Sequence, residues 1–384
     1  MKVLVGTLTK GKTSGGVDQY LFQFLDNVKQ NNSSLQLDFL THDYNIELEQ
    51  ELNSYGSKLH IIPSLKYPIK QYRRIRSLIR EYSYDVVYFN ISTSVNFVGT
   101  YAAQKEKLST RIVHAHSNGF DIQSNIKRQC MSLLNFIFKT LISRLATHYW
   151  TNSEESAVWV FGSHFINKNT YQVIPLPIDL STFHYQPNIR VLYREQFQLK
   201  DEIIFGHVGR FSYQKNHRFL LNVFHKLHSI LPQSKLILVG VGELYHEVQS
   251  YIKELGLDDS VMLLGKRNDI SNLMQVFDVF LFPSRFEGAG IVVLEAEACG
   301  VSCYVSDSVP KVVDLANQLT FLDIKSNNAV SNWANHIVSD IQNGRLEGRE
   351  SNHTIQTQFI LKNYGLGTYN YANALMKCTR SNHD

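Results

Sequence analysis

Long apolar runs and an export signal are both missing from this sequence of 384 residues. A transmembrane helix needs roughly 18 or more apolar residues in succession, and no such stretch occurs. The apolar start at 1–7 is too short to be a secretory signal peptide. We therefore expect a cytoplasmic protein, or one that binds the inner face of the cell membrane peripherally.

Cysteine is scarce as well. The chain has four cysteines, Cys130, Cys299, Cys303 and Cys378. They have no CxxC spacing, which argues against a zinc site. Disulfides are not expected in a chain without an export signal. We therefore expect four free thiols and a fold held together by its apolar core.

Two successive runs of alternating strand and helix patterns fill the chain. The first run has predicted strands at 2–7, 35–41, 58–62, 85–90, 111–115, 148–152 and 171–175. The second has predicted strands at 203–208, 235–240, 260–264, 278–282 and 301–305. This alternation is typical of parallel sheets covered by helices. With 43% hydrophobic residues the chain can form two such α/β domains, each with its own core.

A segment with two glutamates is the most informative part of the chain. Glu287 and Glu295 are separated by seven residues, and glycines occupy positions 288 and 290. A strand pattern precedes this loop, and a helix pattern follows it as far as Gly300. A helix N-terminus after a glycine loop binds anions through its free N–H groups. Glu287 is predicted at the mouth of the loop, and Glu295 about two turns into the helix.

This pattern resembles the nucleotide-sugar site of the retaining glycosyltransferases with the two-domain GT-B fold (family 4). The resemblance implies two Rossmann-like domains facing a cleft, with a helix near 355–377 that returns to the N-terminal domain. It implies an acceptor-binding domain at 1–178, together with 355–384, and a nucleotide-sugar-binding domain at 179–354.

Other segments match the same family in the expected order. Those at 208–216, 238–244 and 261–267 resemble successive strand ends of its C-terminal domain, and those at 14–17 and 112–117 resemble strand ends of its N-terminal domain. The match is closest to bacterial capsule and exopolysaccharide transferases.

The resemblance also implies a role for individual residues. The catalytic candidates are Glu287, His116, Arg210 and Lys215. The substrate-binding candidates are Gly15, Gly16, Gly242, Arg267, Gly288, Ala289, Gly290 and Glu295. Glu287 is expected to hold donor hydroxyls and Glu295 the ribose, while the cations face the diphosphate. His114 is a rival to His116, because both point to the same side of a strand. Glu297 and Ala289 depart from common family choices, which leaves the donor sugar open.

The implied reaction is retaining transfer of a hexosyl group from a nucleotide sugar, a UDP-sugar by preference, to a lipid-linked oligosaccharide in exopolysaccharide or capsule synthesis. The chain has no Asp-x-Asp sequence, so we expect no metal and no other cofactor. Three alternatives on the same fold stay open: a UDP-sugar 2-epimerase, a phosphorylase with a pyridoxal-phosphate lysine, and a non-catalytic partner subunit.

One motif points to another class of protein. Residues 6–13 satisfy the spacing G-x-x-x-x-G-K-[ST] of a P-loop, with Lys12 as its lysine. Gly15 and Gly16 interrupt the helix that this motif requires, because glycine is costly inside a helix. We therefore interpret the match as accidental, with an NTPase as the less favoured alternative.

Positive charge is concentrated in the first half of the chain. Residues 1–180 hold 19 Lys and Arg against 14 Asp and Glu, and the rest hold 19 against 20. The basic positions gather at 66–80 and again at 127–144, around the apolar stretch at 133–138. They could form a solvated helix surface or a surface that docks on an anionic membrane. Nucleic acid is not an expected partner, because no base-stacking module is recognisable.

Overall fold

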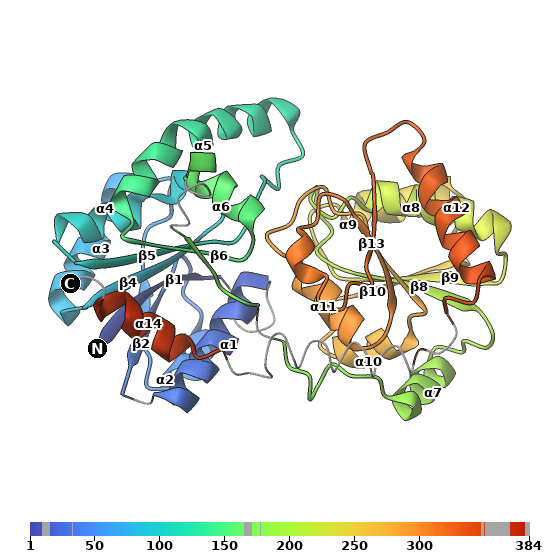
Figure 1. The fold of residues 1–384 in the computed structure, drawn as a ribbon, viewed down its shortest axis with the longest axis horizontal. Helices are drawn as coiled ribbons and strands as arrows, with labels where there is room; N and C mark the ends of the chain where they lie inside the picture. Colours follow the sequence, from blue (N-terminus) through green and yellow to red (C-terminus); the bar gives the residue numbers. More distant parts are fainter. Residues whose placement is uncertain are drawn as a thin grey trace. The chain divides into compact units, whose positions relative to one another are not determined.

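The structure is a computed structural model that describes residues 1–9, 16–32, 34–164, 171–176, 178–346, 349 and 369–380. The chain forms two compact α/β units (Figure 1). Unit 1 consists of Met1–Phe120, Asn125–Pro177 and Gly367–Asp384, and unit 2 of Asp121–Ser124 and Ile178–Leu366. Each unit holds one parallel sheet with helices on both faces, which confirms the predicted α/β class with two Rossmann-like domains.

The sheet of unit 1 has seven parallel strands. They are β1 (Lys2–Leu8), β2 (Gln36–Thr41), β3 (Leu59–Ile61), β4 (Val86–Ile91), β5 (Thr110–Ala115), β6 (His148–Thr151) and β7 (Tyr171–Val173). Their order in the sheet is β3-β2-β1-β4-β5-β6-β7. The order reverses between β1 and β4, so the loops after these two strands diverge to opposite faces of the sheet.

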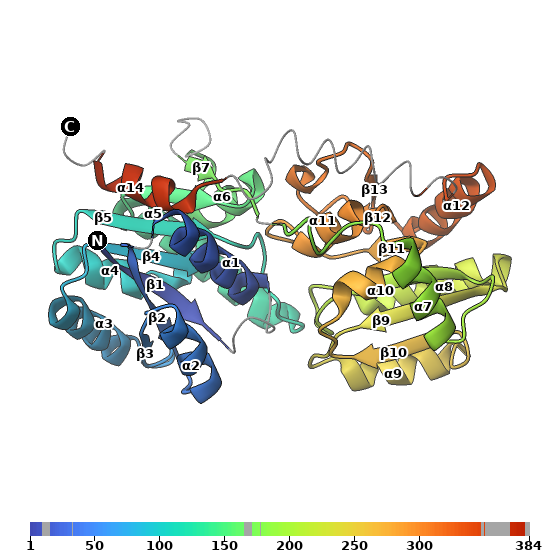
Figure 2. The same ribbon diagram turned by 90° about the horizontal axis from the view of Figure 1, so that it is seen from below.

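Helices cover both faces of this sheet (Figures 1 and 2). One face carries α1 (Gly16–Asn31), α2 (Ile46–Ser54) and α14 (Tyr371–Arg380). The other face carries α3 (Pro68–Tyr82), α4 (Val98–Lys105), α5 (Asn125–Leu145) and α6 (Glu154–Phe161). The short η1 (Ser94–Asn96) precedes α4. None of the described helices is both long and apolar enough to cross a membrane.

The C-terminal helix α14 packs on unit 1, as expected from the family resemblance. The Tyr371 ring lies 5.2 Å from that of Phe24 on α1, and its backbone N–H donates to Asn27 Oδ1 at 3.1 Å. Its hydroxyl donates to the carbonyl of Pro175 at 2.8 Å. The helix begins at Tyr371, later than predicted, and residues 355–368 lie outside the described part of the chain.

The sheet of unit 2 has six parallel strands. They are β8 (Ile203–Val208), β9 (Ser234–Val239), β10 (Val261–Gly265), β11 (Val279–Phe282), β12 (Ser302–Ser306) and β13 (Thr320–Leu322). Their order is β10-β9-β8-β11-β12-β13, so the order reverses between β8 and β11. The short edge strand β13 is absent from the sequence prediction, because its three residues are only partly buried and show no apolar run.

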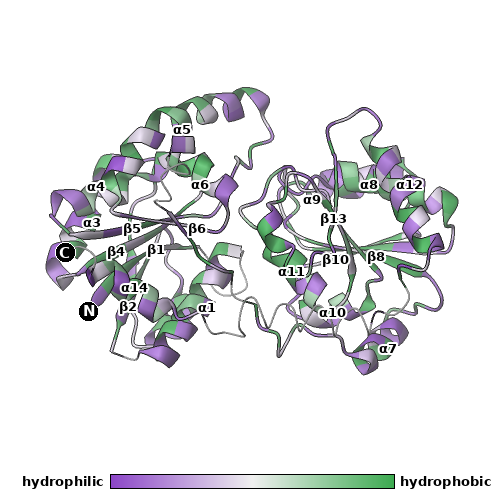
Figure 3. Ribbon diagram, in the orientation of Figure 1, coloured by the Kyte–Doolittle hydropathy of each residue, from purple (hydrophilic) through white to green (hydrophobic). Residues whose placement is uncertain are grey.

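The helices of unit 2 also lie on both sides of its sheet. One side holds α8 (His217–Ile230), α9 (Tyr245–Glu254) and α12 (Ala329–Gln342). The other side holds α7 (Pro187–Gln196), α10 (Ile270–Val276) and α11 (Ile291–Ala298). The short η3 (Lys311–Val313) follows β12. All four residues of the central β11 are buried, as is typical of a parallel strand covered on both faces. Figure 3 shows the corresponding apolar character of α11.

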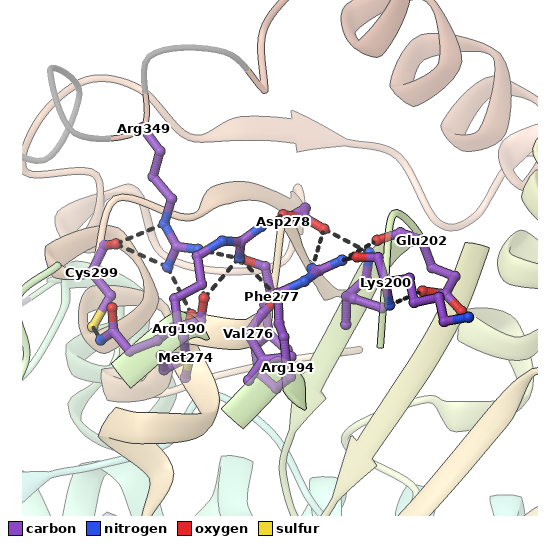
Figure 4. A network of polar contacts seen from close by, with 12 residues as sticks. Arg190, Arg194, Lys200, Glu202, Met274, Val276, Phe277, Asp278, Cys299 and Arg349 are labelled. Carbon is purple, nitrogen blue, oxygen red and sulfur yellow. Dashed lines mark hydrogen bonds and ion pairs between the residues drawn. The ribbon is translucent and has the colours of Figure 1, made fainter. Parts of the chain in front are cut away.

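A buried polar network secures α7 and Arg349 to the core of unit 2 (Figure 4). Arg190 on α7 forms an ion pair of 2.5 Å with Asp278 at the start of β11. The Arg349 guanidinium donates to carbonyls at the C-terminal ends of two helices. These are the carbonyls of Met274 and Gln275 in the last turn of α10, of Phe277 directly after it, and of Cys299 directly after α11. Helix C-termini carry partial negative charge that favours a cation. Burial lowers the pKa of Arg349 to about 10, so it stays charged at neutral pH.

Candidate functional site

The loops after β8 and β11 meet where the strand order of unit 2 reverses. Ligands of open parallel sheets bind at such a point, beyond the carboxyl ends of the strands. Three hydrogen bonds join the two loops. Gln214 Nε2 donates to the Phe286 carbonyl at 3.0 Å, Arg285 N–H to the Gln214 carbonyl at 2.8 Å, and Asn216 Nδ2 to the Pro283 carbonyl at 3.1 Å.

Lys215 and Glu287 form an ion pair across these loops. Lys215 Nζ lies 2.7 Å from Glu287 Oε1, and the side chains are 14% and 7% exposed. The ammonium also lies 4.3 Å from the ring centroid of Phe282, the last residue of β11. The structure therefore brings together two of the predicted catalytic residues, although 72 positions separate them in the sequence.

Helix α11 begins directly after the glutamate loop. Gly290 is its N-cap residue with φ +91°, a left-handed conformation that favours glycine. Gly288 and Ala289 are buried in the same loop. Glu295 is 6% exposed and is the fifth residue of the helix, which begins at Ile291. It therefore lies little more than one turn into the helix, and the prediction of about two turns was wrong, because five residues at about 3.6 residues per turn span only about 1.4 turns.

Arg210 and Gly242 lie on the neighbouring loops after β8 and β9. Arg210 is exposed, and its Nη2 lies 2.9 Å from Glu243 Oε2. A Cβ atom on Gly242 would come within 2.3 Å of the Phe211 carbonyl oxygen, so close backbone contact between these loops requires glycine here. This packing accounts for Gly242 without a ligand.

Arg267 lies on the loop after β10, at the edge of the sheet. Its guanidinium forms a bidentate pair with Asp269, at 2.8 and 2.6 Å. The hydrogen bond from Arg267 is the main reason that the pKa of Asp269 is lowered. In this structure Arg267 thus pairs with its own neighbour, and its loop lies two strands further from the Lys215–Glu287 pair than the loop of Arg210 does.

The remaining candidates belong to unit 1. Gly16 is the first residue of α1 and is exposed. Gly15 and Lys12 lie outside the described residues. Asp18, on the first turn of α1, accepts hydrogen bonds from the Thr9 N–H at 3.0 Å and the Thr9 hydroxyl at 2.8 Å, which fixes the end of β1 against the start of the helix.

His116 follows β5 and is held through both ring nitrogens. Nε2 lies 2.6 Å from Asn90 Oδ1, and Asn152 Nδ2 lies 2.9 Å from Nδ1. His114 lies beside it with a ring-centroid distance of 4.0 Å, so both rings are on the same side of the strand as expected. His114 is fully buried between Tyr88, at 2.7 Å, and Asn152, at 2.6 Å.

Burial lowers the pKa of His116 to about 3 and that of His114 well below its ordinary value. Both imidazoles are therefore neutral at physiological pH. Since the two nitrogens of His116 are occupied by side-chain amides, contact with a ligand would require one of these hydrogen bonds to open.

Two family models match this chain. One is described as "Glycosyl transferases group 1" and matches residues 190–342; the other, "Glycosyl transferase 4-like", matches residues 31–150. The chain belongs to the group 1 glycosyltransferases. This glycosyltransferase is 29% identical over 342 residues to "Putative glycosyltransferase EpsF" of Bacillus subtilis (strain 168), covering 87% of each chain.

Another relative of this glycosyltransferase is the Escherichia coli "UDP-Gal:alpha-D-GlcNAc-diphosphoundecaprenol alpha-1,3-galactosyltransferase". The identity is 27% over 253 residues, which cover 65% of this chain and 63% of the relative. Among solved structures, Anabaena Alr3699/HepE in complex with UDP-glucose has a TM-score of 0.74 at 20% identity, over 98% of this chain and 100% of that chain. Its likeness shows that the glycosyltransferase has the GT-B fold.

Sequence reasoning missed several polar residues around the Lys215–Glu287 pair of this glycosyltransferase. His207 and His217 are buried beside it, and Gln214 and Asn216 join its two loops. One signal was available, since His207 interrupts an otherwise apolar strand. The others follow only from the adjacency of β8 and β11.

Glu297 is a buried carboxyl on the same helix as Glu295. Its Oε1 accepts a hydrogen bond from Ala316 N–H at 3.2 Å, and its Oε2 has no hydrogen-bond partner among the described residues. Burial raises the pKa of Glu297 to about 8, with a further contribution from Asp314. Glu297 is therefore protonated at neutral pH and contacts the loop before β13.

We predict that Glu297→Gln stabilises the protein increasingly as pH rises from 5 to 8. An unfolded Glu ionises near pH 4.3, whereas folded Glu297 ionises at about 8, so the folded state binds the extra proton between these values. Stability of the unmodified protein should therefore fall as pH rises through this window. Gln cannot ionise and keeps an acceptor for Ala316.

Thermal unfolding at pH 5, 6.5 and 8 measures the effect, with Glu254→Gln on the exposed surface of α9 as the control. If the difference in Tm between Glu297→Gln and the unmodified protein is the same at all three pH values, Glu297 is not protonated at neutral pH and the prediction is wrong.

Proposed function

We propose that this glycosyltransferase moves a hexosyl group, with retention of configuration, from a UDP-sugar to a lipid-linked oligosaccharide in exopolysaccharide or capsule synthesis. The observation that carries the proposal is the Lys215–Glu287 ion pair. Its side chains are mostly buried where the strand order of unit 2 reverses, and the N-terminus of α11 follows the glutamate loop. Such a site offers a carboxylate for sugar hydroxyls, and a cation and helix N–H groups for a diphosphate.

Each residue has a distinct part in the proposed reaction. Glu287 holds donor hydroxyls and Glu295 the ribose. Lys215, Arg210 and the N-terminus of α11 stabilise the charge that builds on the departing diphosphate. Stabilisation of developing charge by preorganised groups is usually the largest catalytic contribution. His116 and the Gly15–Gly16 loop are assigned to donor contact by the family resemblance.

Relatives and structural neighbours support the choice of substrates. Two relatives are named for transfer to diphosphoundecaprenol-linked sugars, one in Escherichia coli and one in Campylobacter jejuni. The Anabaena neighbour was solved with UDP-glucose and with UDP. A UDP-sugar as donor and a lipid-linked sugar as acceptor are the substrates that agree with these relatives and with this neighbour.

The central test compares Lys215→Ala with Lys226→Ala. Lys215→Ala should lower kcat by about 10² or more, the scale of losing one group that stabilises transition-state charge. Lys226 on α8 donates to Ser331 Oγ at 2.8 Å, away from the glutamate loop, and its loss should leave kcat unchanged. Transfer from a radiolabelled UDP-sugar to a lipid-linked acceptor is the measurement.

Lys12→Ala separates the transferase from a P-loop NTPase. The transferase should tolerate this change and should lose transfer in Glu287→Ala while remaining folded. ATP hydrolysis that disappears in Lys12→Ala, together with indifference to Lys215→Ala and Glu287→Ala, would overturn the proposal. Release of an epimerised sugar without an acceptor would instead identify a 2-epimerase.

We further expect transfer to survive treatment with EDTA. The chain has no Asp-x-Asp sequence, and among the described residues no cluster of three His, Cys, Asp or Glu side chains is arranged to hold a metal. Lys215 and Arg210 supply positive charge for the diphosphate instead. Initial rates after dialysis against EDTA, with and without added Mg²⁺ or Mn²⁺, test this. Complete loss restored by either ion would refute it.

Docking on an anionic membrane is part of the same proposal. Helix α5 exposes Leu133, Phe136 and Ile137, which are 61%, 71% and 57% exposed, and apolar residues alternate with polar ones along it (Figure 3). Lys139 lies on the same helix, with its ammonium 5.6 Å from the Trp159 ring. Apolar side chains beside cations bind the interface of an anionic bilayer. The basic cluster of α3 contributes less, because Arg76 and Arg80 are both paired with Glu106.

Replacing Leu133, Phe136 and Ile137 with Gln should weaken binding to anionic liposomes at least tenfold. Burial of each apolar side chain in the interface contributes on the order of 1 kcal/mol, and Gln preserves the helix. Co-sedimentation with vesicles is the measurement. Val191→Gln with Leu192→Gln, two exposed apolar residues of α7, is the matched control. Equal binding by both variants would assign the α5 surface to another role.

A further inference from the structure

Two histidines lie behind the Lys215–Glu287 pair. His207, near the end of β8, is fully buried, and its Nδ1 lies 2.8 Å from the Leu281 carbonyl oxygen of β11. A carbonyl oxygen only accepts hydrogen bonds, so Nδ1 carries the proton and Nε2 presents a lone pair in the neutral ring. This Nε2 atom is buried and has no hydrogen-bond partner among the described residues.

His217 is the first residue of α8 and is 2% exposed. Its ring stacks on Phe211 at 4.2 Å and meets the edge of His207 at 4.9 Å. Neither ring nitrogen has a hydrogen-bond partner within the described residues. A buried polar group without a partner costs about 1–3 kcal/mol. Phenylalanine would make the same ring contacts without that cost, so packing alone does not explain a histidine here.

The His207 imidazole lies close to the side chain of Lys215, and His217 packs against His207. A Cβ atom on Gly209 would be 3.0 Å from His207 Nε2 and 3.2 Å from both Cδ and Cε of Lys215. The imidazole lone pair and the lysine stem therefore border the same small space, which Gly209 leaves open. His217 follows Lys215 by two residues, where the loop ends and α8 begins.

The two rings carry no charge at physiological pH. Burial lowers the pKa of His207 to about 4 and the pKa of His217 well below its ordinary value, and the charge of Lys215 acts in the same direction on both. A neutral lone pair attracts an ammonium group without neutralising it. A second carboxylate in the same place, in addition to Glu287, would further offset the lysine charge that a diphosphate requires.

We propose that His207 and His217 are positioning residues for Lys215. Their two uncharged imidazoles form a polar surface that holds the lysine ammonium between Glu287 and the donor diphosphate. The role in transfer rests on the proposed function, whereas the closeness of His207 to Lys215 and the packing of His217 on His207 do not. This account explains why two buried imidazoles keep ring nitrogens that have no hydrogen-bond partner among the described residues.

The first test is His217→Phe, which keeps the stacking on Phe211 and removes both nitrogens. Its Tm should be equal to or higher than that of the unmodified protein, while kcat falls about tenfold, less than the roughly 10² lost with a group that itself stabilises transition-state charge. His207→Asn, whose amide can still donate to Leu281, should lower kcat similarly. In a Lys215→Ala background neither change should lower kcat further, because both act through the lysine.

His228→Phe is the matched control. His228 lies on the same helix and stacks on Phe224 at 5.7 Å, but its ring nitrogens have partners in Ser234 and Ser260, at 3.2 and 3.0 Å. This change should lower Tm and leave kcat unchanged, the opposite pattern to His217→Phe. A His217→Phe variant with undiminished kcat, or one whose loss persists in the Lys215→Ala background, would overturn the proposal.

A second measurement works without any transfer assay. Acetylation of Lys215 by acetic anhydride, followed by peptide mass spectrometry, reports how firmly the ammonium is held. The rate should rise several-fold in His217→Phe and in His207→Asn and stay constant in His228→Phe. Unchanged rates in both site variants would overturn the positioning role. Faster labelling in a protein that neither binds a UDP-sugar nor transfers one would uphold the positioning role and refute the proposed function instead.

Discussion

The adjacency of β8 and β11 is the constraint on which the candidate site depends. These strands come from different parts of the chain, and the strand order of the second sheet reverses between them. Their parallel direction brings both carboxyl ends to one edge, so the loops that carry Lys215 and Glu287 meet there. The side-chain amides of Gln214 and Asn216 donate hydrogen bonds across the loops, and the Gln214 carbonyl accepts one from the Arg285 N–H, which fixes the loops against each other.

An enclosed ion pair of this kind is weak evidence for stability. Removing two charges from water costs about as much free energy as their attraction returns, so such pairs are often neutral or destabilising. The buried imidazoles of His207 and His217 add further polar groups that the core has to accommodate. Charges and unpaired nitrogens gathered at a strand-order reversal are better explained by a ligand than by the fold.

Other buried polar groups are explained by the fold itself. Arg349 binds carbonyls at the ends of α10 and α11, and Asp278 accepts from both Arg190 and the Ile204 backbone N–H. Every donor in these contacts has a matching acceptor, which is the usual condition of buried polar groups. The ring nitrogens of His217, by contrast, have no partner in the described structure. This difference distinguishes the polar groups that support the fold from those of the candidate site.

Much of the fold could be predicted because it depends on local patterns. Apolar runs alternating with helical periodicity placed twelve of the thirteen strands in the described part of the chain to within two residues of their bounds. The short strand β13 escaped, because three partly buried residues carry no periodic signal. Glu295 was placed too far into its helix, although α11 begins directly after Gly290 as the glycine pattern indicates.

The sequence by itself determined the order of strands and helices, the glycine loop before α11 and the spacing of the two glutamates. These features depend on neighbours within a few residues. Only the tertiary structure decided which polar groups meet: Lys215 with Glu287, Arg210 with Glu243, Arg267 with Asp269, and His207 with the Leu281 carbonyl. Most of these partners are tens of residues apart, and even Arg267 and Asp269 depend on how the loop after β10 turns. Such contacts follow from the order of strands in a sheet, which no local pattern specifies.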